Sequence, residues 1–189
     1  MKIYVVNWFG PFSSIEDVEK WEKKNNENCN FYLIDGYFPR SKVLRYYCGQ
    51  TKREGVHCRL KDKSHPINDF KKISEIWIGF LVNSDGEKDE INIVEKMATS
   101  VLAKKIGDKY MVNKTNKSFP KTDVCLINEW KKKDKSSWKQ CKFEESVMKI
   151  IPDVMLHKYV YEKDYEMKHH IIKGSEKMKI LIDDWVEDF

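Results

Sequence analysis

The chain has 189 residues, of which 41% are apolar and 13% are aromatic. This length and composition suit one folded domain with a sizeable core and exclude a disordered chain. The excess of 35 Lys and Arg over 30 Asp and Glu gives a net charge of +5, which favours a polyanionic partner.

The sequence contains no pattern typical of secretion or of a membrane span. The opening MKIYVVNWFGPF has too short an apolar run for either. The five cysteines include no CxxC pair, which indicates reduced thiols rather than a disulfide framework. We therefore expect a cytoplasmic protein with no membrane partner.

The N-terminal segment, residues 1–27, predicts a strand followed by a helix. Residues 2–9 are rich in the apolar and aromatic side chains of strands. Ser13 and Glu16 then stand three positions apart, the spacing of a capping box, and the apolar residues that follow recur at helical spacing. We expect this segment to be an appendage that packs on the rest of the chain.

The middle of the chain predicts the order strand, strand, helix, strand, helix. Two short β-type runs, 31–34 and 43–49, flank a turn-rich loop and predict a hairpin. A helix-compatible stretch at 53–65 ends before a proline, and 75–81 predict a third strand. Residues 90–108 have an apolar stripe at helical spacing and a glycine after the terminal lysines, which predicts a long helix.

The last segment, residues 119–189, is expected to be a C-terminal elaboration. Residues 127–142 interleave lysines with two tryptophans, which indicates either a nucleic-acid-binding face or a solvated loop that its tryptophans anchor to the core. Residues 154–172 predict a hairpin and 175–189 an amphipathic helix. Together the elements predict one compact α+β domain, in which a small mixed or antiparallel sheet is flanked by helices.

Four polar side chains follow one another through the middle of the chain. Tyr32 lies in the first strand, Tyr47 precedes a glycine in the second, and Arg59 lies in the helix that follows. Glu95 borders the apolar stripe of the long helix, where a carboxylate is costly to bury unless it is paired or metal-bound. Because alternate residues of a strand share a face, we expect Tyr46 in the core and Tyr47 on the opposite face.

This order of elements and residues resembles the GIY-YIG nuclease family. NFY at 30–32 stands where that family has GIY, and YCG at 47–49 stands where it has YIG. Arg59 and Glu95 fall at the places of the family's arginine and metal-binding glutamate. The resemblance covers residues 28–118 and implies a GIY-YIG-like core between the N- and C-terminal elaborations.

The resemblance implies hydrolysis of a phosphodiester with Mg²⁺ or Mn²⁺ bound by Glu95. One carboxylate can hold a Mg²⁺ that keeps several waters and binds a phosphate oxygen. Arg59 offers a charged fork that matches a phosphate. The phenol of Tyr32 or Tyr47 can hydrogen-bond the attacking water and take its proton, provided that its pKa is lowered. His57, beside the arginine, is a further catalytic candidate as a proton acceptor.

Other polar residues are expected to contact the nucleic acid. Asn113 resembles the family's asparagine after the glutamate helix, and Asn116 and Asn128 are its rivals. The remaining candidates are basic: Lys52, Arg53, Lys63, His65, Lys131, Lys132 and Lys133.

The expected function is a metal-dependent endonuclease that acts on DNA, with RNA as an open alternative, and a stand-alone role in restriction or defence. Departures from both family triads leave a second hypothesis, a non-catalytic nucleic-acid-binding or regulatory protein on the same scaffold. A third is an unrelated α+β interaction domain. Catalysis requires Tyr47 and Glu95 to face one cleft, whereas the third hypothesis scatters Tyr47, Arg59 and Glu95 over separate faces.

Overall fold

The computed structural model of the chain describes residues 1–82, 87–138, 146–159 and 166–170. The helix expected at 175–189 and the turn of the hairpin expected within 154–172 lie outside the described residues.

Strands from most of the described chain join in one mixed sheet of seven strands, in the order β3-β2-β4-β1-β5-β6-β7. Among these strands β1 and β5 pair in parallel, and the other neighbours are antiparallel. The strands are β1 (Lys2–Phe12), β2 (Phe31–Tyr37), β3 (Leu44–Gln50), β4 (Lys72–Leu81), β5 (Val124–Lys131), β6 (Val154–Lys158) and β7 (Glu166–His170). The fold class is α+β, as the sequence predicts, with a larger sheet than expected.

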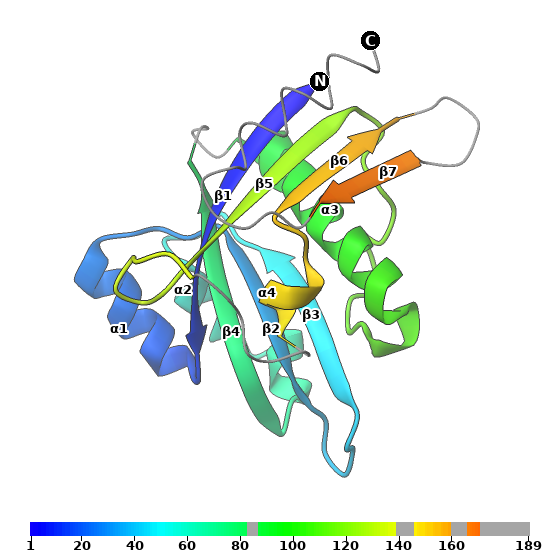
Figure 1. Cartoon of the computed structure of the whole chain (residues 1–189). Coiled ribbons are helices and arrows are strands. Elements are labelled where there is room, and N and C mark those ends of the chain that lie inside the picture. Colours follow the sequence, from blue (N-terminus) through cyan, green and yellow to red (C-terminus); the bar gives the residue numbers. More distant parts are fainter. Residues whose placement is uncertain (83–86, 139–145, 160–165, 171–189) are drawn as a thin grey trace.

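Helices flank this sheet, and Figure 1 shows α1 and α3 on opposite sides of it. The longest described helix, α3, is the one that the sequence predicts most clearly, and its apolar stripe is buried. The helices are α1 (Ile15–Asn25), α2 (Val56–Leu60), α3 (Lys88–Ile106) and α4 (Val147–Ile150), with 3₁₀ turns η1 (Pro66–Asp69) and η2 (Asp108–Tyr110).

β1, from the segment expected as an appendage, lies at the centre of the sheet between β4 and β5. Its side chains alternate between two apolar cores. Tyr4, Val6 and Trp8 join the core that contains α3 and the start of α4. Phe9 and Phe12 join the core that contains the apolar residues of α1, α2 and η1. Since a strand covered on both faces is mostly apolar on both, this position explains why β1 is predominantly apolar, with Asn7 as a buried polar exception.

The ends of α1 and α3 follow from their sequences. The Ser14 side chain caps α1 by accepting the Asp17 backbone N–H at 3.1 Å. The capping box predicted at Ser13 and Glu16 is therefore wrong by one residue; the Ser13 hydroxyl donates instead to the Asp17 carboxylate at 2.8 Å. α3 ends at Gly107, where φ is 90°, a backbone conformation that favours glycine.

β5 is a strand that the sequence analysis did not predict, because its apolar first half runs directly into the lysine-rich stretch 127–142, whose composition indicates a polar segment. Trp130 in β5 is 4% exposed and stacks on Trp8 of β1, with ring centroids 5.7 Å apart. Trp138 donates its indole N–H to the backbone of β1 at 3.2 Å. Of the two interpretations of 127–142, the described part of that segment fits the one in which tryptophans anchor it to the core.

Two carboxyl groups face each other across β2 and β4. Asp35 is paired with Glu75 in the antiparallel register and is 2% exposed. Its Oδ1 has no hydrogen-bond partner among the described residues, whereas Glu75 accepts the backbone N–H of Val147 at the start of α4. Burial, together with the neighbouring Glu75, raises the pKa of Asp35 well above its usual range. Asp35 therefore carries its proton at neutral pH in the folded chain.

We expect Asp35→Asn to stabilise the fold, and to do so more strongly as the pH rises. The folded chain keeps the Asp35 proton to a higher pH than the unfolded chain, so wild-type stability falls as the pH rises above about 4. Asparagine does not titrate. The thermal unfolding temperature of the variant, minus that of the wild type, should therefore be larger at pH 8 than at pH 5.

Asp89→Asn, at an exposed position early in α3, is the matched control and should leave the pH dependence of unfolding unchanged. An Asp35→Asn effect of equal size at both pH values would contradict a buried proton at Asp35.

Candidate active site

Tyr32 and Tyr47 lie side by side on one face of the β2–β3 hairpin. In the antiparallel register Tyr32 pairs with Gly49 and Ile34 with Tyr47, which places the two rings diagonally on the same face. Their ring centroids are 5.9 Å apart. Tyr46 points to the opposite face, into the core that contains α3, as strand alternation predicts.

Gly49 makes this arrangement of the two tyrosines fit. A Cβ at this position would clash with Cζ and the hydroxyl of Tyr32. Tyr32 is 1% exposed, so its ring has no free space into which to move. The glycine that follows the second tyrosine in sequence therefore makes room for the first tyrosine, on the neighbouring strand.

His65 holds the hydroxyl of Tyr32 in place. Its Nδ1 accepts the backbone N–H of Ile67 at 3.0 Å, at the start of η1. The proton of the neutral ring is therefore on Nε2, which donates to the Tyr32 hydroxyl oxygen at 2.9 Å. Burial lowers the pKa of His65 to about 4, and the charge of Arg59 adds to this effect, so the ring is neutral at physiological pH.

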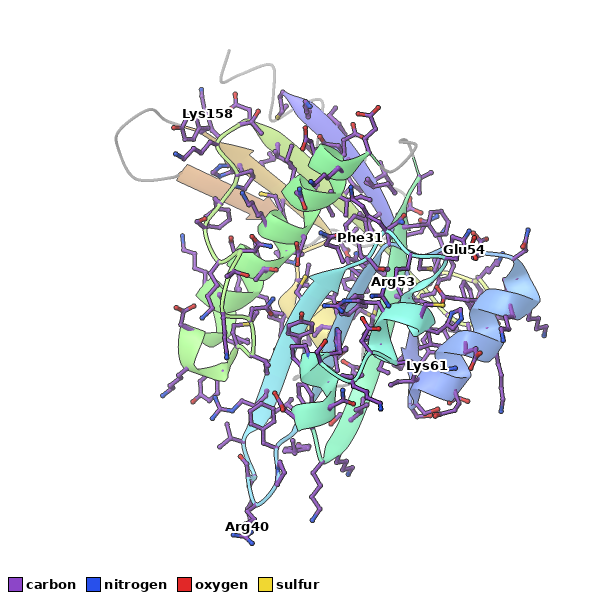
Figure 2. All side chains as sticks on the ribbon, turned by 180° about the vertical axis from the view of Figure 1, so that it is seen from behind. Phe31, Arg40, Arg53, Glu54, Lys61 and Lys158 are labelled. Carbon is purple, nitrogen blue, oxygen red and sulfur yellow. The ribbon has the colours of Figure 1, made fainter. Side chains whose placement is uncertain are left out.

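Arg59 lies on α2 beside the hydroxyl of Tyr32, and Asp62 holds it there. One carboxylate oxygen of Asp62 pairs with Arg59 and the other with Arg53, each at 2.6 Å. Burial and Tyr47 raise the pKa of Tyr32, and the nearby charge of Arg59 offsets part of this rise. Arg53, labelled beside α2 in Figure 2, and Arg59 thus form a pair of positioned guanidinium groups next to the tyrosines.

A cavity of about 400 Å³ opens beside this cluster, at the edge of the sheet formed by β3. Its polar lining includes Tyr47 from β3, Lys63 and His65 from the connection between α2 and η1, Glu95 from α3, and Asn113 from the segment after η2. Tyr47 and Glu95 therefore face one cavity, and Arg59 lies beside Tyr32. Of the three residues that the interaction-domain hypothesis places on separate faces, Tyr47 and Glu95 thus share one cavity, and Arg59 lies outside its lining.

Glu95 is a buried carboxylate in this cavity and is 7% exposed. Burial raises its pKa, and the side-chain amide of Asn116, which donates to Oε2 at 2.9 Å, offsets part of the rise. Among the ion pairs of the described residues, none involves Glu95. A divalent cation would supply the missing positive charge, so the carboxylate fits the role of a metal ligand.

The donor set for such a cation is small. Within the described ranges, no group of three or more His, Cys, Asp or Glu side chains is arranged to hold a metal ion. A cation at Glu95 would therefore take most of its ligands from waters or from a bound molecule, a mode of binding that Mg²⁺ commonly adopts in proteins.

Both tyrosines are protonated phenols at neutral pH. Burial raises the pKa of Tyr32 far above its ordinary value, and it also raises the pKa of Tyr47, which the neighbouring Tyr32 partly offsets. In this state neither phenol is poised to act as a base. The Tyr47 hydroxyl, which lines the cavity, can instead orient a water molecule by hydrogen bonding.

The three candidate asparagines have different roles. Asn113 binds the outer edge of β3, where its side-chain oxygen accepts the Cys48 N–H at 2.9 Å and its amide donates to the Cys48 carbonyl at 2.7 Å. Asn116 orients Glu95. Asn128 lies in the core, where it accepts a tryptophan N–H at 2.8 Å. Asn113 lines the cavity, but its side chain is occupied by the strand backbone.

Several of the predicted site residues do not line the cavity. His57 faces Glu22, with Nδ1 2.7 Å from a carboxylate oxygen. The three lysines at the end of β5 contact Glu129 or the rings of Trp138 and Phe12. The predicted residues outside the cavity lining are Tyr32, Lys52, Arg53, His57, Arg59, Lys131, Lys132 and Lys133, of which Tyr32 and Arg59 adjoin it through Tyr47 and His65.

Sequence analysis missed two carboxylates that organise this region. Asp62 had a detectable signal, because it stands three residues after Arg59 in a helix-compatible stretch. Glu22 had none, since its partners Val56 and His57 are more than 30 residues away in the chain.

Comparison of the chain with protein-family models, with curated proteins and with solved structures finds no match. In the part of the chain that the structure describes, no helix has both the length and the apolar character needed to cross a membrane.

Substitutions at His65 should separate its two hydrogen bonds and remove one source of acid sensitivity. Asparagine can keep the acceptor for the Ile67 N–H, and glutamine can keep the donor to Tyr32. Unfolded histidine takes up a proton near pH 6.5, whereas folded His65 does so near pH 4, so its contribution to stability is lost as the pH falls through this interval.

Urea unfolding of the wild type and both variants at pH 7 and pH 4.5 measures this contribution. Each variant should lose about 1–3 kcal/mol at pH 7 and show a smaller drop toward pH 4.5 than the wild type. Variants that keep the full wild-type drop would show that His65 is not the group responsible.

We expect Gly49→Ala to destabilise the fold by about 1–3 kcal/mol through overpacking against the Tyr32 ring. The cost should be smaller in a Tyr32→Ala background, where the ring is absent. Denaturant unfolding of both single variants and of the double variant measures this coupling. A cost of Gly49→Ala that is the same in both backgrounds would contradict the close contact with the ring.

Proposed function

We propose that this protein is a metal-dependent endonuclease of the GIY-YIG type, which hydrolyses phosphodiester bonds of DNA. The observation that carries the proposal is the meeting of Tyr47, His65 and Glu95 in one cavity, with Tyr32 beside Tyr47 and His65, and Arg59 beside Tyr32. These groups come from elements that are separate in the chain and from both sides of the sheet.

The arrangement of elements supports the family resemblance. β2, β3, α2, β4 and α3 follow one another in the predicted order, and β2 pairs with β3 and β4 in an antiparallel unit. The tyrosines of the NFY and YCG motifs lie on adjacent strands with their rings in contact, and the glycine of YCG makes room for the tyrosine of NFY. The NFY and YCG motifs are thus in direct contact through Tyr32, which packs against both Tyr47 and Gly49.

Each side chain has a role that its geometry supports. The positive charges of Lys63, Lys114 and Arg59 are placed to attract a phosphodiester to the cavity. Glu95 would hold Mg²⁺ or Mn²⁺, and such an ion supplies positive charge to the phosphate and lowers the pKa of a bound water. The Tyr47 hydroxyl orients the attacking water, and the Tyr32 ring, whose centroid lies 5.9 Å from that of Tyr47, limits how the Tyr47 ring can move.

Asp62 limits how strongly Arg53 and Arg59 can bind a phosphate of the substrate. Its carboxylate neutralises part of the charge of Arg53 and Arg59 while it positions them. Both ion pairs are partly exposed, so a phosphate can compete for the guanidinium groups at modest cost.

A second candidate function is nucleic-acid binding without cleavage. One observation favours it, namely that burial raises the pKa of both tyrosines, so neither is an obvious base. In this alternative the cavity binds a phosphate through the same basic residues, and Glu95 has no catalytic role.

The proposed nuclease activity predicts that two conservative substitutions reduce cleavage. Glu95→Gln should lower the rate of DNA cleavage with Mg²⁺ by about 100-fold or more, because it removes the metal-binding carboxylate. Tyr47→Phe should lower it about tenfold, which corresponds to one lost hydrogen bond to the water. The measurement is the rate of nicking and linearisation of supercoiled plasmid, with a single-stranded DNA and an RNA of equal length as parallel substrates.

Each substitution has a matched control. Tyr46→Phe removes a hydroxyl on the opposite face of the same strand, and Glu87→Gln removes an exposed carboxylate at the start of α3. Both should cleave as the wild type does. Binding of DNA with no cleavage in Mg²⁺, Mn²⁺ or Co²⁺ would support the binding protein instead, and neither binding nor cleavage would end both proposals.

A further inference from the structure

Glu22, His57 and Cys58 form a second cluster of reactive side chains, away from the cavity lining. Glu22 comes from α1, and His57 and Cys58 are consecutive residues of α2. Their polar atoms stand in series. Glu22 Oε2 lies 2.7 Å from His57 Nδ1, and His57 Nε2 lies 3.3 Å from the Sγ of Cys58.

Contacts with the backbone fix the Glu22 carboxylate in place. Its side chain is 2% exposed. Oε1 accepts the backbone N–H groups of Cys29 at 3.3 Å and Val56 at 2.9 Å, and Oε2 accepts that of His57 at 3.0 Å. Because every one of these partners is a donor, the carboxylate is held as an acceptor toward the imidazole of His57.

This acceptor sets the tautomer of His57. The ring donates its Nδ1–H to Glu22, so the neutral ring has a lone pair on Nε2, the nitrogen nearest to the thiol. The Cys58 S–H can therefore donate to Nε2 and give up its proton there. A nucleophile, a base and a carboxylate that orients the base are thus in sequence, the order found in activated thiols.

Cys58 is also the accessible thiol among the cysteines that the structure describes. Cys29, Cys48 and Cys125 are buried, and burial raises the pKa of each of those thiols. Cys58 is half-buried, so a small reagent can reach its sulfur, and accessibility is one of the surroundings typical of reactive cysteines.

Two other uses of the cluster fit less well. A metal site would need three suitable ligands, and none of the His, Cys, Asp and Glu groupings in the described ranges qualifies. A large organic substrate would need a cavity beside the thiol, and the cavity described above is lined by other residues. A small reagent that reaches Cys58 from the surface remains the best match.

We propose that Cys58 is a modification site, at which a small electrophile of the hydroperoxide class oxidises the thiol with His57 as the base and Glu22 as the group that positions it. Cys58 directly precedes Arg59 in the sequence, so the modified residue lies on the same short helix, α2, as the guanidinium beside Tyr32. The proposal stands on the geometry of Glu22, His57 and Cys58 and does not require nuclease activity.

The oxidation of Cys58 needs no reagent other than the hydroperoxide. Cys58 passes its S–H proton to His57 Nε2, and the thiolate attacks the distal oxygen of the hydroperoxide. An S–O bond forms as the O–O bond breaks, and the leaving oxygen takes the proton from His57. The sulfur is oxidised by two electrons to a sulfenic acid, and hydrogen peroxide is reduced to water.

Alkylation of the full-length chain by iodoacetamide, followed by peptide mass spectrometry, tests the activated thiol. At pH 7, Cys58 in the folded chain should react about tenfold faster than in the urea-unfolded chain. His57→Gln should remove this advantage at pH 7, but its rate should converge with the wild-type rate near pH 10, where thiols ionise without a base. This pH profile separates a base from a residue that merely packs.

Glu22→Gln is the second variant, and thermal unfolding establishes that each variant is folded. Glu22→Gln should slow alkylation at pH 7 less than His57→Gln does, because glutamine can still accept from the backbone but holds the imidazole less firmly. A wild-type rate no higher than the unfolded rate, or a His57→Gln profile equal to the wild type, would overturn the proposal.

Treatment with hydrogen peroxide in the presence of a 1,3-dione, which captures sulfenic acids, tests the reagent class. The adduct should appear on the Cys58 peptide of the wild type and be reduced about tenfold in His57→Gln. Rapid alkylation of Cys58 with no captured sulfenic acid would overturn the assignment to hydroperoxides.

Discussion

The packing of the Tyr32 ring over Gly49 is the contact on which the rest of the candidate site depends. It fixes a buried hydroxyl at the interface of two strands, and the groups around it are arranged by that hydroxyl. His65 donates to it from the start of η1, Arg59 approaches it from α2, and the Tyr47 ring packs beside the Tyr32 ring on the side of the cavity. A side chain at position 49 would displace the Tyr32 hydroxyl, around which side chains from η1, α2 and β3 are arranged.

The location of the cavity follows from the two-sided covering of the sheet. Tyr47 and His65 belong to the face covered by α1, α2 and η1, whereas Glu95 comes from α3 on the other face. A sheet separates side chains that lie on its two opposite faces, except beside an edge strand. β3 is a border strand, so the cavity forms where side chains from both faces can reach around it. This geometry explains why a tyrosine on a strand and a glutamate on a helix beneath that strand can share one space.

Sequence patterns predicted the features of this protein that depend on neighbouring residues in the chain, such as strand alternation and helical spacing. Strand alternation separated Tyr46 from Tyr47, and helical spacing located α3 and the place of Glu95 at the border of its stripe. The central position of β1 and the existence of β5 depend on a parallel pairing of segments more than 100 residues apart, which no local pattern encodes. The roles of His65 and Glu22 were likewise hidden, because each is defined by backbone or side-chain partners that only the folded chain brings near.

The segment 111–113 covers the border of β3 and so has a bearing on self-association. Met111 forms a bridge with Tyr46, Val112 donates to the Tyr46 carbonyl at 2.8 Å, and the Asn113 side chain satisfies both backbone groups of Cys48. An uncovered border strand offers its free N–H and C=O groups to strands of other molecules, which is a common route to aggregation. Because Val112 and Asn113 also line the cavity, detachment of the segment would at once expose the unpaired edge of β3 and disrupt the candidate site. Solubility and the integrity of the site are therefore coupled through three residues.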